Sequence, residues 1–447
     1  MKNLKTNIFF FFILFLLQGC SDLSDLDDPG KKDDPIGLSS FASLQELANK
    51  AIASGKVDLY STMGTKSGLI TVGDASGCVV MVNGKLKCWG QNDNSQLGEG
   101  STTNRAAPVW ANSVNPISTA DIIVAVVSGR SSTCAYFYSG LKCWGNQALG
   151  VLGNGQTTSF ASTPQTVTNV TGRTIKYIQL NDGFSCIQDT LGVVSCWGDN
   201  SKAQLGNGNQ TNSTTAVNAS LGGGSSQLIA QNNDSCSLVG SSVKCWGKAF
   251  SNVSPFIPVS INFGGATPVQ LGGGTTFLPN LTCVVMSNST VQCFGSTTNN
   301  SGELGNGTNT APANAVTGYT VLNAITGQSL SGVAMVATGD SGANLDLNYG
   351  CAVADDYTNV YCWGTNTYGN LGNGTTNNTN KATKVTKTWP GSDIIDLAVS
   401  DGRACILLKN NDVWCWGGNS YNKGELGNGS SNGNTTTAIK ILNRNDP

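Results

Sequence analysis

The stretch CVVMVNGKLKCWG, residues 78–90, places two cysteines on either side of an Asn-Gly pair and ends on Trp-Gly. Taken alone, it is consistent with a metal clip, a redox dithiol, a reactive thiol or a hairpin closed by a disulfide. The arrangement returns six more times, once with Phe-Gly in place of Trp-Gly, and the second cysteine of each copy stands at 88, 143, 196, 245, 293, 362 and 415. The rest of the chain therefore bears on what this segment does.

The repeated unit predicts the fold. Six of the seven copies are followed by a Leu-Gly-x-Gly element, which begins at Leu97, Leu152, Leu205, Leu304, Leu371 and Leu426. Each unit divides into four short strands, which in the last copy are DIIDLAVS, ACILL, DVWCWG and TTTAIKIL. A period of about 50 residues with several strands per unit is typical of a β-propeller with one blade per repeat. We predict an all-β protein, a seven-bladed β-propeller over residues 69–447, in which closure leaves no large exposed sheet edge.

The two cysteines of each repeat form a local pair. The pairs are Cys78 with Cys88, Cys134 with Cys143, Cys186 with Cys196, Cys236 with Cys245, Cys283 with Cys293, Cys351 with Cys362, and Cys405 with Cys415. A separation of ten places two cysteines directly opposite only if the hairpin loop has an odd number of residues. In the first copy that loop is Val82-Asn83-Gly84, and a three-residue hairpin favours a left-handed third residue such as glycine. Gly192 and Asn411 hold the same place in two other copies, Gly240-Ser241 supplies an even loop, and Ser289 suits its third position less well.

Disulfides explain these pairs better than metal or redox chemistry. A structural metal site needs four converging ligands, usually from Cys-x2-4-Cys pairs and histidine, and redox catalysis favours Cys-x-x-Cys. The chain has neither spacing, and it has no histidine. We therefore predict seven disulfides, no metal and no cofactor. Each disulfide closes a short loop and stabilises the fold by about 3 kcal/mol in the chain-entropy model. Together the seven contribute less than seven times this amount, because each hairpin is already partly ordered by its turn.

Composition excludes several classes of function. Without histidine there is no Ser-His-Asp or Cys-His site and no imidazole acid or base. The formal charge is −2 and no lysine/arginine run is present, so we expect no nucleic-acid partner. The six repeated tryptophans fall at one place in each unit and are expected in the blade core, and the Gly-Asn-Gly elements are expected to be turns rather than phosphate cradles.

The N-terminus indicates export. Lys2 and Lys5 precede an apolar run at 8–17, too short to span a bilayer, and Gly19-Cys20 follows. This pattern resembles a bacterial lipoprotein signal, although an ordinary signal peptide with an incidental cysteine remains an alternative. We expect a signal peptide at 1–19, a lipidated Cys20 with an acidic flexible tether over 20–40, and a short amphipathic helix with a linker at 41–68. The lipid anchor would make the membrane a partner.

The repeat resembles a known family. The segments CWGDNSKAQLGNG (196–208) and CWGTNTYGNLGNG (362–374) are similar to the regulator of chromosome condensation repeat, and the likeness covers about residues 69–443. The cysteine-paired form resembles exported bacterial members. The resemblance implies a seven-bladed propeller whose members mostly hold a protein partner on one face, as exchange factors, chromatin binders, photoreceptors or a β-lactamase inhibitor. No exchange-factor site can be carried over to this chain.

Two departures break the symmetry of the repeat. Blade 4 lacks the Leu-Gly element after Trp246-Gly247, and the unit whose first cysteine is Cys351 carries extra residues after Gly339. The insertion holds a candidate binding loop of Asp340, Asn344, Asp346 and Asn348, whose spacing matches no calcium motif, so a polar surface loop is the simpler interpretation. Its Gly-Asp-Ser-Gly motif has no histidine to act as a base. We expect specific binding at 339–350 and 248–280.

These features lead to one main hypothesis and two alternatives. We expect a monomeric, non-enzymatic binding or scaffold protein of the bacterial cell envelope, anchored by lipid and holding a protein or glycan partner on a propeller face. Ser21 after the lipidated cysteine favours the outer membrane. The first alternative is a glycan-acting enzyme that uses paired carboxylates, and the second is a structural envelope lipoprotein without a discrete ligand.

Overall fold

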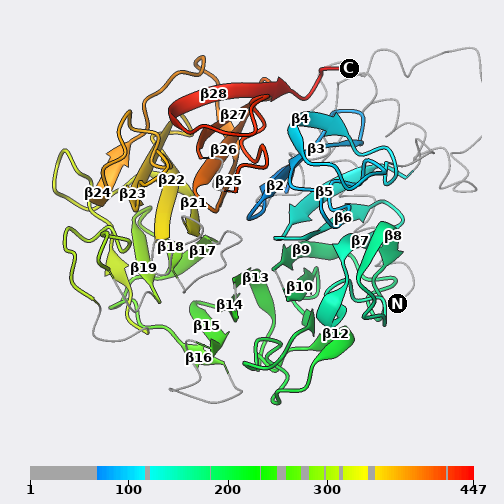
Figure 1. Ribbon diagram of the computed structural model, residues 1–447. Helices are drawn as coiled ribbons and strands as arrows, with labels where there is room; N and C mark the ends of the chain where they lie inside the picture. The colour runs from blue at the N-terminus through cyan, green and yellow to red at the C-terminus, as the bar shows by residue number, and fades with distance from the viewer. Residues whose placement is uncertain are drawn as a thin grey trace, which may run out of the picture. The chain divides into compact units, whose positions relative to one another are not determined.

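The computed structural model describes residues 68–115, 121–181, 183–231, 233–248, 258–272, 281–295, 299–311, 316–340, 348–418 and 421–447. They form seven four-stranded antiparallel sheets set around a ring (Figure 1), so the predicted seven-bladed β-propeller is confirmed. The predicted signal peptide (1–19), Cys20 with its tether (20–40) and the helix and linker up to residue 67 lie outside the described residues. In the described part of the chain, no helix is both long and apolar enough to cross a membrane.

Each blade uses four consecutive strands, which we call A to D from the centre of the ring outward. Blade 1 comprises β1 (Ile70–Val72), β2 (Ser76–Val80), β3 (Leu86–Gly90) and β4 (Arg105–Trp110). Blade 2 comprises β5 (Ile123–Ser128), β6 (Ser132–Phe137), β7 (Gly140–Asn146) and β8 (Phe160–Thr166), with a 3-10 turn, η3 (Ala148–Gly150), before its last strand. Blade 3 comprises β9 (Ile175–Leu180), β10 (Phe184–Asp189), β11 (Val194–Gly198) and β12 (Ser213–Asn218).

The remaining blades follow the same order, with shorter outer strands in blades 4 and 5. Blade 4 comprises β13 (Ser225–Gln231), β14 (Asp234–Val239), β15 (Ser242–Gly247) and β16 (Val259–Ser260). Blade 5 comprises β17 (Pro268–Gly272), β18 (Thr282–Met286), β19 (Val291–Phe294) and β20 (Tyr319–Thr320). Blade 6 comprises β21 (Val333–Asp340), β22 (Asn348–Ala354), β23 (Asn359–Gly364) and β24 (Thr379–Lys384). Blade 7 comprises β25 (Ile394–Ser400), β26 (Arg403–Leu408), β27 (Asp412–Gly417) and β28 (Thr435–Asn443).

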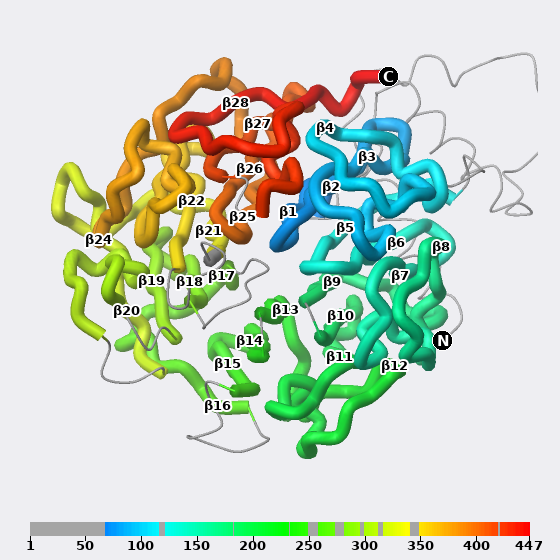
Figure 2. The backbone as a smooth tube through the Cα atoms, viewed as in Figure 1, coloured from blue at the N-terminus to red at the C-terminus, as the bar shows by residue number. Residues whose placement is uncertain are grey.

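The A strands of successive blades contact one another around the centre, and the D strands lie outermost (Figure 2). Because neighbouring strands of a blade alternate in direction, the A–B and C–D connections open on one face of the ring, and the B–C turns and the links between blades open on the other. We call the first the loop face; it holds connections such as 73–75 and 91–104. We call the second the hairpin face; it holds turns such as 82–84.

The hairpin turns have the geometry that the cysteine spacing predicts. Gly84, Gly192 and Asn411 occupy the third loop position with φ of 72°, 79° and 71°. Ser289, which suits this position less well, also adopts it, with φ of 60°. The register of each B–C hairpin therefore places the two cysteines of a blade directly opposite one another.

The structure joins all seven predicted cysteine pairs as disulfides. Each disulfide links the B strand of a blade to its C strand, with Cα–Cα distances of 4.0–4.1 Å. From blade 1 to blade 7 the bonds join Cys78 to Cys88, Cys134 to Cys143, Cys186 to Cys196, Cys236 to Cys245, Cys283 to Cys293, Cys351 to Cys362, and Cys405 to Cys415. All fourteen cysteines are buried, so the disulfides belong to the core of the ring.

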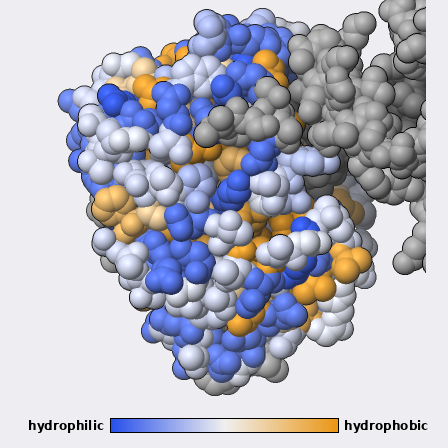
Figure 3. Space-filling view, turned by 90° about the vertical axis from the view of Figure 1, so that its right-hand side faces the viewer, coloured by the Kyte–Doolittle hydropathy of each residue, from blue (hydrophilic) through white to orange (hydrophobic). Residues whose placement is uncertain are grey.

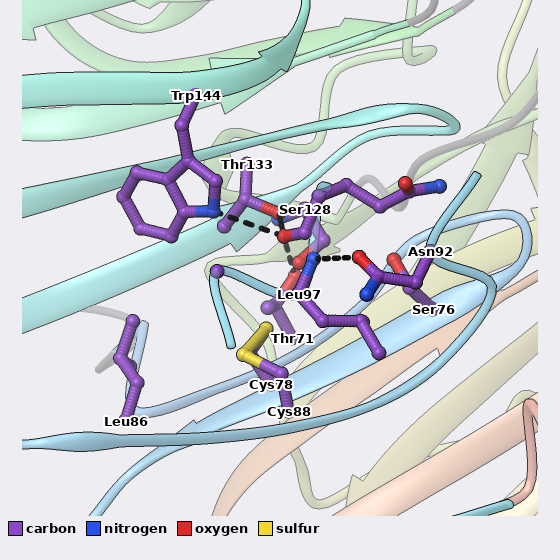
Figure 4. Close-up of a disulfide and its surroundings, with 12 residues drawn as sticks. Thr71, Ser76, Cys78, Leu86, Cys88, Asn92, Leu97, Ser128, Thr133 and Trp144 are labelled. Atoms are coloured by element: carbon purple, nitrogen blue, oxygen red, sulfur yellow. Dashed lines mark hydrogen bonds between the residues drawn. A yellow bond between two sulfur atoms is a disulfide. The ribbon is translucent and has the colours of Figure 1, made fainter. Parts of the chain in front are cut away.

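A hydrogen bond from each repeated tryptophan joins its blade to the preceding one. The indole Nε1–H donates to the main-chain carbonyl just before the Leu-Gly element of the preceding blade, an interaction that we call the indole latch. Figure 4 shows it for Trp144, beside Leu97 and the disulfide of blade 1. The six latches are Trp144 to Gln96 (3.0 Å), Trp197 to Val151 (2.7 Å), Trp246 to Gln204 (2.9 Å), Trp363 to Glu303 (3.0 Å), Trp416 to Asn370 (3.0 Å) and Trp89 to Glu425 (2.9 Å).

The contact between blades 4 and 5 is built differently. Blade 5 carries Phe294 where the other blades carry tryptophan, and blade 4 is the unit without a Leu-Gly element. Phe294 packs edge-on against Phe263, which follows β16, with ring centroids 5.8 Å apart. The donor and the acceptor of the latch are therefore both replaced at the same contact, and an apolar aromatic pair lies there instead.

Side chains rather than a shared strand close the ring between blades 7 and 1. The described strands of each of these two blades come from one continuous segment of the chain. The buried guanidinium of Arg403 in β26 donates to the carbonyls of Gly73, Asp74 (3.0 Å) and Asp401 (3.2 Å). On the hairpin face, Arg444 donates through Nε to the carbonyl of Val80 at 2.6 Å. Together with the latch from Trp89, these bonds hold both faces of the junction.

Candidate functional site

The loop face carries the longest connections, and a buried amide organises most of them. In blade 3, Asn200 Oδ1 accepts the N–H of Leu205 at 3.0 Å, and its Nδ2 donates to Asn207 Oδ1 (3.1 Å) and to the carbonyls of Asn209 (3.0 Å) and Thr211 (3.1 Å). The same role is taken in blades 1, 5 and 6 by Asn92, Asn299 and Asn366. All four side chains are buried. The repeated asparagines thus build the loops, and only the loop tips are available for binding.

The glycine of each Leu-Gly element leaves room for the indole that forms the latch. Gly372 has φ of 62°, and a Cβ atom there would lie 2.7 Å from Cδ1 of Trp416. The corresponding glycines of four other loops would bring a Cβ within 2.6–2.9 Å of the indole of the next blade, whereas a Cβ at Gly98 would first meet Val114, at 2.6 Å, and the Trp144 indole at 3.1 Å. The Gly-Asn-Gly elements are turns of the framework, as the sequence predicts.

The predicted binding loop is only partly described. Asp340 ends β21 and pairs across the hairpin with Asn348, which begins β22. Asn348 is buried, so it belongs to the sheet rather than to an exposed loop tip. Asn344 and Asp346 lie outside the described residues, as do 249–257 and 273–280 of the second region expected to bind.

A charged cluster that sequence analysis did not single out lies on the loop face at the junction of blades 7, 1 and 2. Burial raises the pKa of the Tyr421 hydroxyl well above its usual value, and the negative charges of Asp401 and Asp74 raise it further, while Arg130 lowers it. Tyr421 also hydrogen-bonds Asp401. The two carboxylates and the arginine thus surround one hydroxyl.

The positions of these residues in the repeat could have identified the cluster. Asp74, Arg130 and Asp401 each stand in the A–B connection of their blade, within two residues of the end of β1, β5 and β25, and the ring brings these connections together. Asp74 and Asp401 are almost completely buried, whereas Arg130 and Tyr421 are partly exposed. A tyrosine is ordinarily protonated near neutral pH, and the raised pKa of Tyr421 keeps it so, which leaves its hydroxyl as a hydrogen-bond donor. We call Asp74, Arg130, Asp401 and Tyr421 the junction cluster.

Among the described residues, few large apolar side chains are exposed. In the view of Figure 3, hydrophilic residues predominate and apolar residues form small separate patches. On the hairpin face, the exposed apolar side chains Tyr138, Leu191 and Tyr357 belong to the turns of three different blades, and Ile325 lies in the link between blades 5 and 6. Single exposed apolar residues are normal on soluble domains and do not define a docking groove. Among the described side chains, no group of three or more metal-ligating residues is assembled.

Comparison with known proteins identifies the repeat. The chain matches the Regulator of chromosome condensation (RCC1) repeat over residues 359–405 and 394–423. It is 33% identical over 149 residues to the Ultraviolet-B receptor UVR8 of Arabidopsis thaliana, which is 32% of either chain. It is 32% identical over 133 residues to the Protein RCC2 homolog of Danio rerio, 30% of this chain and 26% of the relative. The matched region thus spans a third or less of these curated relatives.

Solved structures share the fold over most of the chain. Human WBSCR16 superposes with a TM-score of 0.63 at 17% identity, covering 76% of this chain and 86% of that structure. Yeast RCC1 (Prp20), solved bound to Kap60, gives 0.63 at 16% identity, covering 84% and 86%. The chain is a seven-bladed β-propeller whose residues 359–423 match the regulator of chromosome condensation repeat.

Proposed function

We propose that this protein is a lipid-anchored component of the bacterial envelope that holds a protein partner on its loop face. The observation that carries the proposal is the difference between the two faces. The long C–D connections all open on the loop face, over a framework tied by indole latches, whereas the B–C turns of the hairpin face are short and closed beneath by disulfides. A rigid framework that presents loops is a common arrangement for recognition.

Related structures support a protein as the partner. The solved yeast RCC1 (Prp20) is bound to Kap60, and Prp20p of Saccharomyces cerevisiae is described with binding to Gsp1p and histones. Those partners belong to those proteins. For this chain we propose a partner in the envelope or on a host surface, because the N-terminal pattern that ends at Cys20 favours export.

Lysines on both faces provide a direct test of the binding face. Lys202 and Lys423 lie in C–D connections of the loop face, and Lys85 and Lys409 lie at turns of the hairpin face. The mature protein, treated with a lysine-reactive crosslinker in envelope extracts, should give crosslinks to one reproducible partner from Lys202 or Lys423. Partner crosslinks confined to Lys85 and Lys409 would contradict the assignment of the loop face.

A matched pair of variants separates the two faces further. Lys202→Glu with Thr376→Arg changes two exposed loop tips, and Leu191→Ser changes an exposed hairpin tip. We expect the first variant to lose the partner and the second to keep it, with unchanged stability in both. Equal retention by both variants counts against the loop face.

The anchor needs its own experiment. Metabolic labelling with palmitate should mark the wild-type chain and not Cys20→Ser, and fractionation should place the labelled protein in the outer membrane. A chain that is exported but unlabelled would exclude the anchor without touching the partner proposal.

The junction cluster supports a second candidate, the glycan-acting enzyme. Asp74 and Asp401 both lie close enough to Tyr421 to raise the pKa of its hydroxyl, so the described residues include one acidic pair on the loop face. Both carboxylates are buried, and the backbone around them is bound by Arg403. Hydrolysis of envelope glycans by the wild type and its loss in Asp401→Asn would favour this candidate over the binding protein.

A further inference from the structure

The disulfides of this ring lie at the contacts between blades, not inside isolated hairpins. In blade 1, Cys78 and Cys88 share a core cluster with Trp144 of blade 2, as Figure 4 shows. In blade 2, Cys134 and Cys143 share a cluster with Trp197 of blade 3. We call each such contact between neighbouring blades a seam. The latching tryptophan of the next blade therefore forms part of the cover over each disulfide.

The disulfide of blade 4 has no such tryptophan. Cys236 and Cys245 share their cluster with Phe294 and Phe263. The Phe294 ring has no N–H to donate, and blade 4 lacks the Leu-Gly element that supplies the acceptor elsewhere. The seam between blades 4 and 5 is thus closed over its disulfide by apolar contact, without the hydrogen bond that the other six seams have in the described part of the chain.

Other polar bonds cross this seam at its outer strands, where main-chain bonds join Asn262 to Val316 and to Gly318, both at 2.9 Å, and also near the centre of the ring. Gln227 in β13 accepts the N–H of Leu271 at 2.6 Å and donates to the carbonyl of Val269 at 3.1 Å. Gln231, at the end of the same strand, accepts from Thr282 at 3.2 Å and donates to Thr338 at 2.9 Å. These bonds hold the inner strands of blades 4, 5 and 6 together. An opening of the seam over Cys236 and Cys245 therefore has to separate the Phe294–Phe263 contact, but it breaks no indole hydrogen bond.

We propose that Cys236–Cys245 is the redox-sensitive disulfide of the folded protein, reached by thiol reagents when the seam between blades 4 and 5 opens locally. A hydrogen bond stabilises a contact enough to change an opening equilibrium about 2- to 10-fold. Local openings of this kind occur below the threshold of global unfolding and admit small reagents. The other six disulfides stay covered by the latched tryptophans.

The chemistry is ordinary thiol–disulfide exchange. A thiolate of dithiothreitol attacks Sγ of one cysteine, the S–S bond breaks, and the other cysteine leaves as a thiolate that takes up a proton. The second thiol of the reagent then displaces the first cysteine. Dithiothreitol is oxidised to its cyclic disulfide, and the protein gains two electrons and two protons as two thiols. The reaction needs no other partner.

Partial reduction under native conditions tests the proposal. The mature protein is treated with dithiothreitol for increasing times, quenched in acid, alkylated and digested, and each pair is quantified by mass spectrometry. We expect Cys236 and Cys245 to be labelled about 2- to 10-fold faster than any other pair. Simultaneous labelling of all seven pairs, which indicates global unfolding, or faster labelling of another pair overturns the proposal.

The matched control removes the latch from another seam. Trp144→Phe gives the seam between blades 1 and 2 the residue that blade 5 carries naturally. We expect faster labelling of Cys78 and Cys88 in this variant, with the rate at Cys236 and Cys245 unchanged. If Trp144→Phe accelerates all pairs equally, the variant unfolds globally, and Cys78–Cys88 is then compared at a lower temperature where the global rate is negligible. No selective effect there rules out the latch as the cover.

Discussion

The indole of Trp89 in blade 1 donates to the main-chain carbonyl of Glu425 in blade 7 at 2.9 Å, although the two residues are 336 positions apart. The same bond joins other blades across 42 to 60 positions. One local rule of the repeat therefore also closes the ring. Joining blade 7 to blade 1 costs more loop-closure entropy than joining any other two neighbouring blades, because it brings together the two ends of the propeller.

Trp89→Phe should weaken this closure. The variant loses one buried hydrogen bond and part of a buried side chain, so we expect a decrease in the free energy of unfolding of about 2 kcal/mol. Denaturant unfolding followed by circular dichroism measures it. Trp414→Phe is the control, since the Trp414 indole N–H has no hydrogen-bond partner among the described residues and only packing is lost. Equal losses in the two variants would show that the bond to Glu425 contributes nothing.

The buried amide that organises each C–D loop should not tolerate a carboxylate. Asn366→Asp keeps the shape but replaces Nδ2, which donates to the carbonyls of Thr375 and Asn377 at 3.0 Å, by an oxygen that faces them. We expect a loss of about 2–4 kcal/mol, smaller at low pH where the acid can donate. Asn377→Asp, at an exposed position in the same loop, should be nearly neutral. A stable Asn366→Asp protein would contradict the structural role of this asparagine.

Two glycines of one loop separate backbone strain from collision with the latch. Gly372→Ala places a Cβ 2.7 Å from Trp416, whereas Gly374→Ala, with φ of 84°, meets only Thr386 Oγ1 at 3.8 Å. We expect about 1 kcal/mol of destabilisation for Gly374→Ala from the left-handed backbone alone and at least twice that for Gly372→Ala. Thermal unfolding of the two variants measures the difference, and equal melting temperatures would exclude the collision.

Asp412 should make the outer edge of blade 7 sensitive to acid. Burial opposes its ionisation, but hydrogen bonds from Lys440 and Asn443 and the charge of Lys440 outweigh this, so its pKa lies below the usual value. The ionised Asp412 carboxylate therefore stabilises the folded protein. This stability is fully present above about pH 4, the pKa of an aspartate in the unfolded chain, and is lost as the pH falls through the lower pKa of the folded state. Asp412→Asn should flatten this part of the stability profile in urea titrations from about pH 6 to about pH 2. A profile as steep as that of the wild type would assign the acid sensitivity to other groups.

Local sequence determined much of the architecture. The seven cysteine pairs, the parity of their spacing and residues such as Gly84 and Asn411 set each hairpin, because a hairpin register depends on a few adjacent residues. The number of copies of the repeat set the number of blades. The absence of histidine likewise excluded sites that use an imidazole, and this conclusion needs only the composition of the chain.

Only the tertiary structure decided which distant residues meet. In the sequence, Phe294 and the missing Leu-Gly element of blade 4 are separate irregularities. In the ring they are the donor and acceptor sides of one latch position, contributed by different blades. The junction cluster and the bonds from Arg403 to blade 1 likewise join residues whose separation carries no local signal. Short-range rules specify a blade, whereas contacts between blades depend on how the closed ring brings side chains together across its seams.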